Sequence, residues 1–288
     1  MADPLDYIGN AVNLTDSDFM SGAIVAILAL QNRKITPIGS GIRVHIGGVD
    51  LIATVGHFDF NEEFKGPFFG NSDWRGIPLS LSRDHYVLDC RFEDDEKGGD
   101  LGYIKLRPEH KLGGWSIGMD RFKTIKGSTD RPFILQGYPG VLTDTRHRGR
   151  VALSDVEMVS LQVGWLREQN EGHLFDYHET GVGRDGEVAE LPHPGGLSGG
   201  PIWHVDDMKS WDRDPPGLET IDTKTQIQQS IIQRKAFGVS LFAIQSSWYP
   251  SERKNYAVSS LNWLRFVARH ESKLAPAIQN FLEVHDGG

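Results

Sequence analysis

Short apolar segments separated by turn residues dominate most of the chain. Two of them, 42–46 and 49–55, alternate apolar and polar positions and are joined by Gly47-Gly48. Two glycines between alternating runs are typical of a tight β-hairpin, because the turn needs positive φ angles. Further strand-like segments lie at 23–28, within 78–92, and at 101–106, 133–136, 151–163 and 236–241. The pattern predicts a mostly β protein with about a dozen short strands.

Helical periodicity is confined to the end of the chain. Leu261, Leu264 and Val267 share one helical face after a capping serine, Ser259 or Ser260. Apolar residues at 274, 278, 281 and 282 indicate a further turn or two. The polar, glycine-containing stretch 107–131 separates two halves of the β region. An all-β body with a C-terminal helix favours a pair of barrels or sandwiches.

Charge and composition exclude several classes of function. The 288 residues carry a net charge of −9, so neither nucleic acid nor an anionic membrane surface is expected as the main partner. A single cysteine, Cys90, permits no intrachain disulfide and no Cys/His zinc module. The pair His173 and His178 and the acidic run 93–96 lack the spacing of metal ligands. We therefore expect no metal and no cofactor.

The location of the protein is predicted from its longest apolar run. The segment 22–30 is too short to span a bilayer. It follows Asp16 and Asp18 rather than a basic segment, which is not the pattern of a secretory signal peptide. With one cysteine, the chain suits a reducing compartment. We expect a cytoplasmic protein.

Three short motifs carry residues that hydrolytic enzymes use. His57 ends an apolar strand, Asp100 precedes another, and Ser198 lies in the turn Gly195-Gly196-Leu197-Ser198-Gly199-Gly200-Pro201. Taken singly, each has an ordinary structural explanation, such as a turn-forming Asp. Dense glycine around a serine, however, leaves room for a substrate carbonyl and frees backbone N–H groups to bind it. The chain order His, Asp, Ser is one of the known orders of a catalytic triad.

This arrangement resembles the trypsin/chymotrypsin-like serine peptidases, and most closely their bacterial members without disulfides. The resemblance extends from about residue 22 to residue 268. It is carried by Gly39-Ser40-Gly41, Thr54-Val55-Gly56-His57, Asp100-Leu101-Gly102-Tyr103-Ile104 and Gly196-Leu197-Ser198-Gly199-Gly200-Pro201. The last motif is the most specific of the four.

The resemblance implies two six-stranded antiparallel β-barrels, with the active site between them, and a C-terminal helix. We expect an N-terminal arm at 1–20, a first barrel with His57 and Asp100 at 21–120, a second barrel with Ser198 at 121–258, and a helix with a tail at 259–288.

The resemblance also implies roles for the motif residues. Ser198 would be the nucleophile that forms an acyl-enzyme, His57 its general base and acid, and Asp100 the group that orients His57. The backbone N–H groups of Gly196 and Ser198 would form the oxyanion hole. The substrate would be a protein or peptide. Since an unregulated cytoplasmic peptidase would be hazardous, we also expect a regulatory protein partner or a narrow specificity.

The sequence departs from the family pattern at several positions. Leu197 replaces an Asp that many secreted members pair with a newly cut N-terminus, so activation by such a cut is not expected. Phe242 falls where a glycine is common, and no acidic residue precedes Ser198 at the expected pocket base. We therefore expect a small or apolar residue before the cleaved bond. The expected substrate-binding residues are Pro192, His193, Ser240, Leu241 and Phe242.

Two alternatives to an active peptidase remain open. A catalytically latent domain that binds peptides or is regulated by a partner is suggested by Leu197 and Phe242, although all three triad residues are present. A serine esterase of the α/β-hydrolase type is disfavoured, because the turn around Ser198 differs from Gly-x-Ser-x-Gly and the chain lacks strand–helix alternation.

Overall fold

The computed structural model describes a β-rich core and the C-terminal helices. The described residues are 22–31, 34–58, 65–70, 87–94, 100–108, 116–125, 133–140, 143–148, 151–156, 159–170, 172–177, 180–182, 188–191, 193–205 and 239–286. The expected N-terminal arm, residues 78–86 of an expected strand segment, Pro192 and His178 lie outside these ranges.

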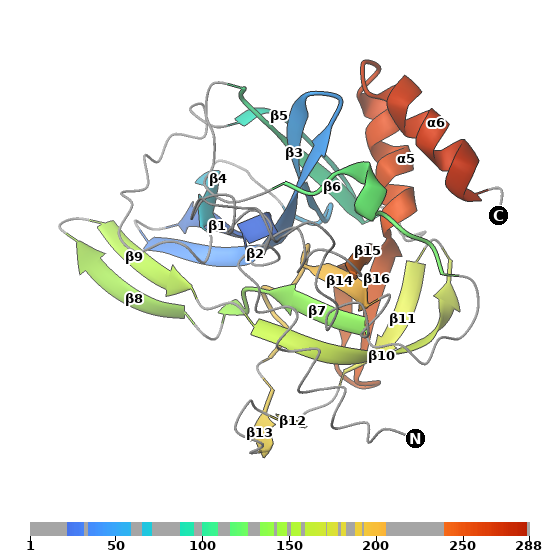
Figure 1. The fold of residues 1–288 in the computed structure, drawn as a ribbon. Helices are drawn as coiled ribbons and strands as arrows, with labels where there is room; N and C mark the ends of the chain where they lie inside the picture. The colour runs from blue at the N-terminus through green and yellow to red at the C-terminus, as the bar shows by residue number, and fades with distance from the viewer. Residues whose placement is uncertain are drawn as a thin grey trace, which may run out of the picture.

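The first half of the chain forms most of an eight-stranded sheet (Figure 1). Its main path runs β4-β1-β2-β3-β6-β5, and β9 and β8 are attached to it through β2. The strands are β1 (Ile24–Gln31), β2 (Lys34–Ile46), β3 (Val49–Thr54), β4 (Lys65–Gly70), β5 (Val87–Glu93), β6 (Leu101–Leu106), β8 (Thr143–Arg148) and β9 (Val151–Val156). The chain thus returns to this sheet after the second half has begun.

The hairpin predicted at Gly47-Gly48 is confirmed. Strands β2 and β3 pair antiparallel up to Ile46 and Val49. Both turn glycines have positive φ angles, 56° at Gly47 and 83° at Gly48. Residues with a Cβ atom rarely adopt such angles, so the turn depends on its two glycines.

The second half forms a closed barrel in the order β10-β11-β16-β15-β14-β7. Its strands are β7 (Phe133–Gly137), β10 (Val159–Gln169), β11 (Gly172–Asp176), β14 (Pro201–Val205), β15 (Val239–Tyr249) and β16 (Lys254–Ser259). A short 3₁₀ helix, η1 (Met119–Arg121), precedes the barrel. Between β11 and β14 along the chain, β12 (Thr180–Val182) pairs with β13 (Val188–Glu190). Every barrel strand has two paired neighbours, so this sheet has no edge.

The expectation of two closed barrels is wrong for the first sheet. Among the described residues its two end strands, β4 and β5, each pair with a single neighbour, so the hydrogen bonding does not return to its start. In place of closure, β9 contacts β2 through one parallel pair, Lys34 with Ala152. Closing a sheet requires strand tilt and register to agree around the whole circle, which short alternating segments do not specify.

The expectation of one C-terminal helix is also corrected. The structure has α5 (Ser260–His270) and α6 (Ala275–Asp286), which pack against each other. Helix α5 ends at His270, and Leu274 and Ala275 then donate backbone hydrogen bonds to the carbonyl of Glu271, the next residue. Pro276 stands in the first turn of α6, where its missing N–H costs nothing.

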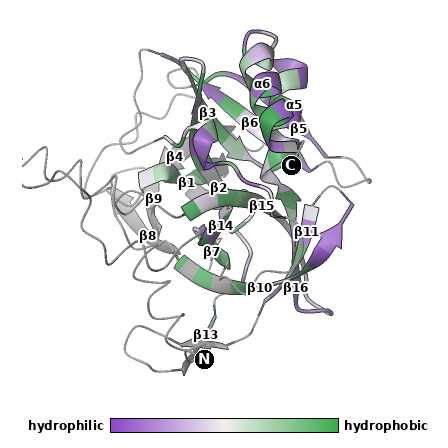
Figure 2. Cartoon of the chain, turned by 45° about the vertical axis from the view of Figure 1, so that its right-hand side comes forward, coloured by the Kyte–Doolittle hydropathy of each residue, from purple (hydrophilic) through white to green (hydrophobic). Residues whose placement is uncertain are grey.

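Two buried clusters hold the molecule together. The larger one joins the first sheet to α5 through side chains such as Ile27, Tyr103 and Trp263. The smaller one lies among the barrel strands and includes Phe133, Leu197 and Phe242. Figure 2 shows hydrophobic colour on barrel strands such as β7, β10 and β15.

The C-terminal helices are fixed to β6 by side-chain hydrogen bonds. The Trp263 indole donates to the Gly102 carbonyl at 2.8 Å, and the Tyr103 hydroxyl donates to Glu271 Oε1 at 2.9 Å. Lys105 Nζ lies 2.6 Å from Glu271 Oε2. Burial and the Glu271 carboxylate together raise the pKa of Tyr103 far above its ordinary value, so the phenol keeps its proton. Helix α5 and Glu271, the residue after it, are therefore attached to the strand that follows Asp100.

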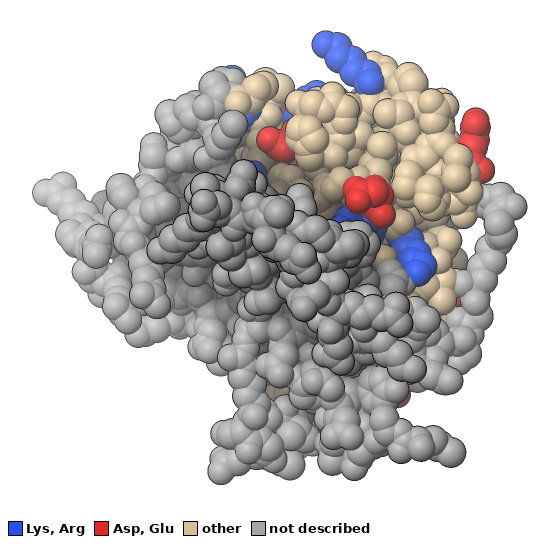
Figure 3. Space-filling model, in the orientation of Figure 1, with Lys and Arg blue, Asp and Glu red and all other residues tan. Residues whose placement is uncertain are grey.

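The described surface in Figure 3 carries Lys, Arg, Asp and Glu side chains interspersed among uncharged residues. No helix in the described ranges is both long enough and apolar enough to cross a membrane.

Candidate active site

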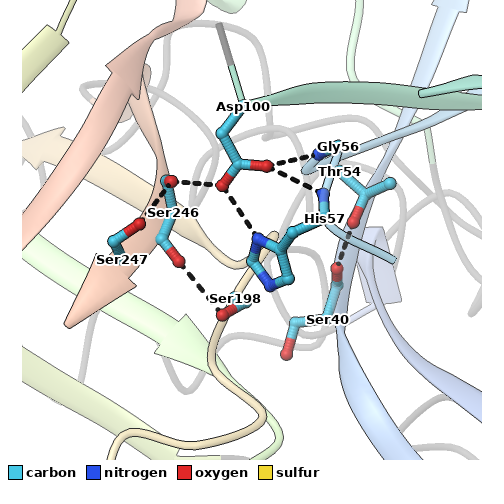
Figure 4. Close-up of polar contacts among 8 residues, drawn as sticks. All are labelled: Ser40, Thr54, Gly56, His57, Asp100, Ser198, Ser246 and Ser247. Carbon is cyan, nitrogen blue, oxygen red and sulfur yellow. Dashed lines mark hydrogen bonds and ion pairs between the residues drawn. The ribbon is translucent and has the colours of Figure 1, made fainter. Parts of the chain in front are cut away.

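The first sheet holds His57 and Asp100 together. Asp100 precedes β6, and His57 follows β3, the strand paired with β6. The Asp100 carboxylate accepts four hydrogen bonds: Oδ1 from the backbone N–H groups of Gly56 and His57, and Oδ2 from His57 Nδ1 and the Ser246 hydroxyl (Figure 4). Gly56 is required here, because a Cβ atom at this position would lie 1.8 Å from the Glu93 carbonyl oxygen.

These contacts define the charge and proton positions of the pair. Asp100 is 7% exposed, and burial raises the pKa of its carboxyl group, but the hydrogen bonds and charge of His57 and the Ser246 hydroxyl outweigh burial and lower it. Burial likewise lowers the pKa of His57, but the hydrogen bond and charge of Asp100, with the charge of Asp94, raise it overall. An ionised carboxylate only accepts, so Nδ1 carries the proton and Nε2 keeps a free lone pair.

Ser198 comes from the barrel side, in the turn that leads into β14. Its backbone carbonyl accepts a 2.7 Å hydrogen bond from the Ser40 N–H on β2. The following N–H groups, of Gly199 and Gly200, donate to the carbonyls of Gln245 and Leu197. The turn is therefore held by both halves of the molecule, and Ser198 faces the His57 ring on the side away from Asp100 (Figure 4).

The Ser198 hydroxyl donates to the backbone carbonyl of Ser246 at 3.1 Å. Among the described residues it makes no hydrogen bond to the His57 imidazole. The Ser246 hydroxyl, on the other side of the same residue, donates to Asp100 Oδ2. One residue of β15 thus contacts both the carboxylate and the serine that the sequence motifs identified.

The backbone before Ser198 presents free N–H groups. Leu197 N–H donates to the Pro194 carbonyl across a tight turn, and Gly196 has a φ of 93°. The Gly195 carbonyl accepts from Gly140 N–H at 2.8 Å. Because N–H and C=O point in opposite directions across a trans peptide, the Gly196 N–H points away from Gly140. Within the described part of the chain, the N–H groups of Gly196 and Ser198 have no partner, which leaves both available to an oxyanion.

Ser40 connects β2 to this turn. Its hydroxyl donates to the Gly196 carbonyl at 2.9 Å and accepts from the Tyr138 N–H at 2.9 Å. Its carbonyl accepts from the Thr54 hydroxyl at 2.9 Å. The Gly-Ser-Gly motif therefore positions the peptide next to the serine turn, a structural role that the sequence analysis did not assign to it.

The structure describes four of the five residues expected to bind substrate, all except Pro192. His193 is exposed, and its Nδ1 accepts from the Gly195 N–H. Ser240, Leu241 and Phe242 are buried in β15. Phe242 packs against Phe133 and His173 with ring centroids 4.9 and 4.2 Å away. The segment of β15 that reaches the site begins at Gln245, several residues further along.

Ser246 is the residue that the sequence analysis missed. Strand β15 is 11 residues long, and its first eight residues are buried. The first polar run that follows its apolar residues, Gln245-Ser246-Ser247, marks the point where the strand reaches the site. That change from apolar to polar residues was the available signal. The described residues contain no group of three or more His, Cys, Asp and Glu side chains placed to hold a metal ion.

Comparisons with known proteins give structural similarities only. No protein-family model matches the sequence, and no curated protein matches it. The chain is similar to the active form of the Rv3671c protease from M. tuberculosis, with 12% identity, a TM-score of 0.41, and coverage of 94% of this chain and 87% of that one. It is also similar to the MamO protease domain from Magnetospirillum magneticum, with 12% identity, a TM-score of 0.40, and coverage of 88% of this chain and 97% of that one. The scabies mite inactivated protease paralogue S-I1 is similar with 11% identity, a TM-score of 0.49, and coverage of 89% of this chain and 98% of that one.

Proposed function

We propose that the chain is a serine endopeptidase of the trypsin/chymotrypsin-like type, which hydrolyses peptide bonds through an acyl-enzyme on Ser198. The observation that carries the proposal is that a His–Asp pair from the sheet and a serine from the barrel meet beside two unpaired backbone N–H groups of the described chain. A nucleophile, a base with an orienting carboxylate, and an oxyanion site are the parts that acyl transfer needs.

In the first half of the reaction, Ser198 Oγ attacks the substrate carbonyl carbon, and its proton passes to His57 Nε2. The carbonyl oxygen becomes negative and is bound by the N–H groups of Gly196 and Ser198. The intermediate then breaks its C–N bond, and the leaving amine takes the proton from His57. The acyl group remains bonded to Ser198 Oγ.

In the second half, a water molecule attacks the acyl carbon and gives its proton to His57. When the C–Oγ bond breaks, that proton returns to Ser198, so the enzyme is regenerated and the acid product leaves. Throughout, Asp100 stays ionised and stabilises the imidazolium. Its four hydrogen bonds and burial fit that role.

Before attack, the Ser198 hydroxyl has to turn from the Ser246 carbonyl toward His57 Nε2. This is a rotation about one side-chain bond, and side-chain rotations take picoseconds to nanoseconds. Hydrogen bonds between catalytic groups are often formed only when substrate is bound. The orientation of the hydroxyl is therefore compatible with turnover.

Labelling with a fluorophosphonate tests the proposal, because the reagent reacts with activated serines. We expect one labelled residue, Ser198, and cleavage of a complex peptide mixture. Ser198→Ala should lose the label and all turnover. Ser272→Ala, which changes an exposed serine in the turn after α5, should keep both. A folded wild-type protein that takes no label and cleaves no peptide would overturn the proposal.

A second candidate, a latent peptide-binding domain, is favoured by one observation. The Ser198 hydroxyl is hydrogen-bonded to the Ser246 carbonyl rather than to the base. If that bond persists with peptide bound, the serine stays unreactive. Labelling distinguishes the two candidates. A latent domain is never labelled, and it binds peptides equally well before and after the Ser198→Ala substitution.

A further inference from the structure

Two buried amide side chains lie at the end of the barrel with hydrogen-bonding capacity left over. Gln245 on β15 is 1% exposed, and Asn255 on β16 is completely buried. Gln245 Nε2 donates to Asn255 Oδ1 at 3.4 Å. Within the described ranges, Gln245 Oε1 and Asn255 Nδ2 have neither a hydrogen-bond partner nor contact with solvent. Buried polar atoms are almost always paired, so this pair needs an explanation.

The amide pair lies next to the serine turn. The backbone of Gln245 exchanges hydrogen bonds with it, accepting from Gly199 at 2.7 Å and donating to Gly200 at 2.8 Å. The residue after Gln245 is Ser246, whose carbonyl accepts from the Ser198 hydroxyl.

Strand pairing shows which way the two amides face. Gln245 pairs with Ala257, and Asn255 pairs with Trp248. Residues directly opposite in a sheet share a face, and residues two apart on one strand also share it. Ala257 belongs to the buried cluster of the barrel, and Trp248 packs against that cluster. Both amides therefore face the barrel interior, at the end nearest Ser198.

The unpaired atoms have a defined chemistry. One is an acceptor and the other a donor. Exchanging O and N in both amides leaves the same result, again one acceptor and one donor. A primary carboxamide supplies the complementary donor and acceptor. A carboxylate supplies acceptors only, an ammonium group donors only, and an aliphatic side chain neither.

We propose that Gln245 and Asn255 select peptide substrates with a carboxamide side chain, Gln or Asn, before the cleaved bond. The proposal rests on the proposed function, because it takes Ser198 as the nucleophile. The side chain of the residue whose carbonyl is attacked is carried by Cα, one bond from the reacting carbon, so it has to lie beside Ser198. This assignment differs from the expectation of a small or apolar residue, which was drawn from Phe242 and from the lack of an acidic residue at the expected pocket base.

The closed state of the pair adds a requirement. Because both unpaired atoms lack solvent contact, an incoming side chain reaches them only after neighbouring side chains move. Trp248, which lies opposite Asn255, is a partly buried large side chain on this face and packs edge-on against Tyr177 with centroids 5.0 Å apart. Its fluorescence should therefore change when a matching peptide binds.

Matched peptides test the selectivity. The peptides differ only in the residue before the cleaved bond, which is Gln, Glu or Met. The wild-type protein should cleave the Gln peptide about 100-fold more efficiently than the Met peptide, since sites built for a hydrogen-bonding group reject analogues that lack it. In Asn255→Leu and Gln245→Met, which keep the side-chain size, the preference should fall at least about 10-fold. Gln279→Leu, which changes an exposed glutamine on α6, is the control and should leave the preference unchanged.

A binding measurement separates this proposal from the proposed function. Fluorescence anisotropy with the same peptides, labelled at one end, is measured on Ser198→Ala protein, which needs no catalysis. Tighter binding of the Gln peptide that is lost in Ser198→Ala/Asn255→Leu supports the selectivity even if the wild type proves inactive. Equal binding of all three peptides overturns it and assigns the amide pair to an internal water only. Urea unfolding of Asn255→Leu and Gln245→Met shows whether each variant is folded.

Discussion

The two β regions are completed in different ways. In the barrel, β7 pairs with β10 and β14, so backbone hydrogen bonds run around the whole circle. The first sheet, as far as it is described, ends at β4 and β5 and is instead covered by α5, through the Trp263 indole and the Glu271 carboxylate. Backbone pairing thus completes the barrel, whereas side-chain contacts with α5 cover the first sheet.

This difference extends to the site. The sheet contributes side chains, His57 and Asp100, whose properties come from a buried carboxylate. Besides the hydroxyl groups of Ser198 and Ser246, the barrel contributes backbone groups, namely the N–H groups around Ser198 and the Ser246 carbonyl. Substitutions on the sheet side should therefore alter proton transfer. Those on the barrel side should alter the binding of the negative oxygen.

The largest effect is expected from the sheet side, at Asp100. Asp100→Asn removes the charge and the acceptor that hold His57 Nδ1–H, so turnover should fall on the order of 10⁴-fold. The pKa of His57 should also fall, because Asp100 raises it and burial lowers it. The pH dependence of kcat/KM reports this directly. The wild type should lose activity as pH drops through a pKa above the ordinary histidine value, and the variant at a lower pH. An unmoved inflection would contradict the pairing.

A smaller loss is expected from the barrel side, at Gly196. This residue has a φ of 93°, and a Cβ atom there would lie 2.6 Å from Gly140 N. Gly196→Val should displace the N–H and lower kcat about 10²- to 10³-fold. Gly48→Val is the matched control, since it has a similar φ of 83° but open space around it. Both variants should lose stability, but only Gly196→Val should lose turnover; equal kcat in the two would contradict the oxyanion assignment.

The smallest effect is expected where α5 packs on the first sheet, and it is measured as a change in the free energy of unfolding. Glu271→Ala leaves the buried Tyr103 hydroxyl and Lys105 ammonium without their acceptor, and should lower the free energy of unfolding by about 3 kcal/mol. Glu93→Gln, at an exposed pair with Arg269 and His270, should cost less than about 1 kcal/mol. Urea unfolding measures both. Equal losses would show that α5 contributes no more through its buried contacts than through its surface ones.

Local structure was predictable from the sequence where the residues of a short segment favour one conformation. The turn at Gly47-Gly48 and the strand 101–106 lie where they were predicted, because alternation and turn glycines are local signals. The first hairpin strand is longer than predicted and begins at Lys34. The sequence did not predict that the first sheet stays open, since closure depends on which distant strands meet. The same applies to β9, which follows β7 in sequence and yet pairs with β2.

The candidate site shows the same limit. His57, Asp100 and Ser198 stood out because each lies in a motif with glycine or strand context. Ser246 had no motif of its own, and the residues expected to bind substrate on this segment were Ser240, Leu241 and Phe242. Strand β15 extends beyond them, and most of its buried residues precede the position that contacts Asp100.

The contact between Ser198 and Ser246 has a consequence for the order in which the protein is made. Ribosomes synthesise a chain from its N-terminus, and Ser246 lies 48 residues after Ser198. A nascent polypeptide that already contains the histidine, the aspartate and the serine still lacks β15 and β16, so its barrel has no closed circle. The complete arrangement therefore forms only after these two strands have left the ribosome and folded.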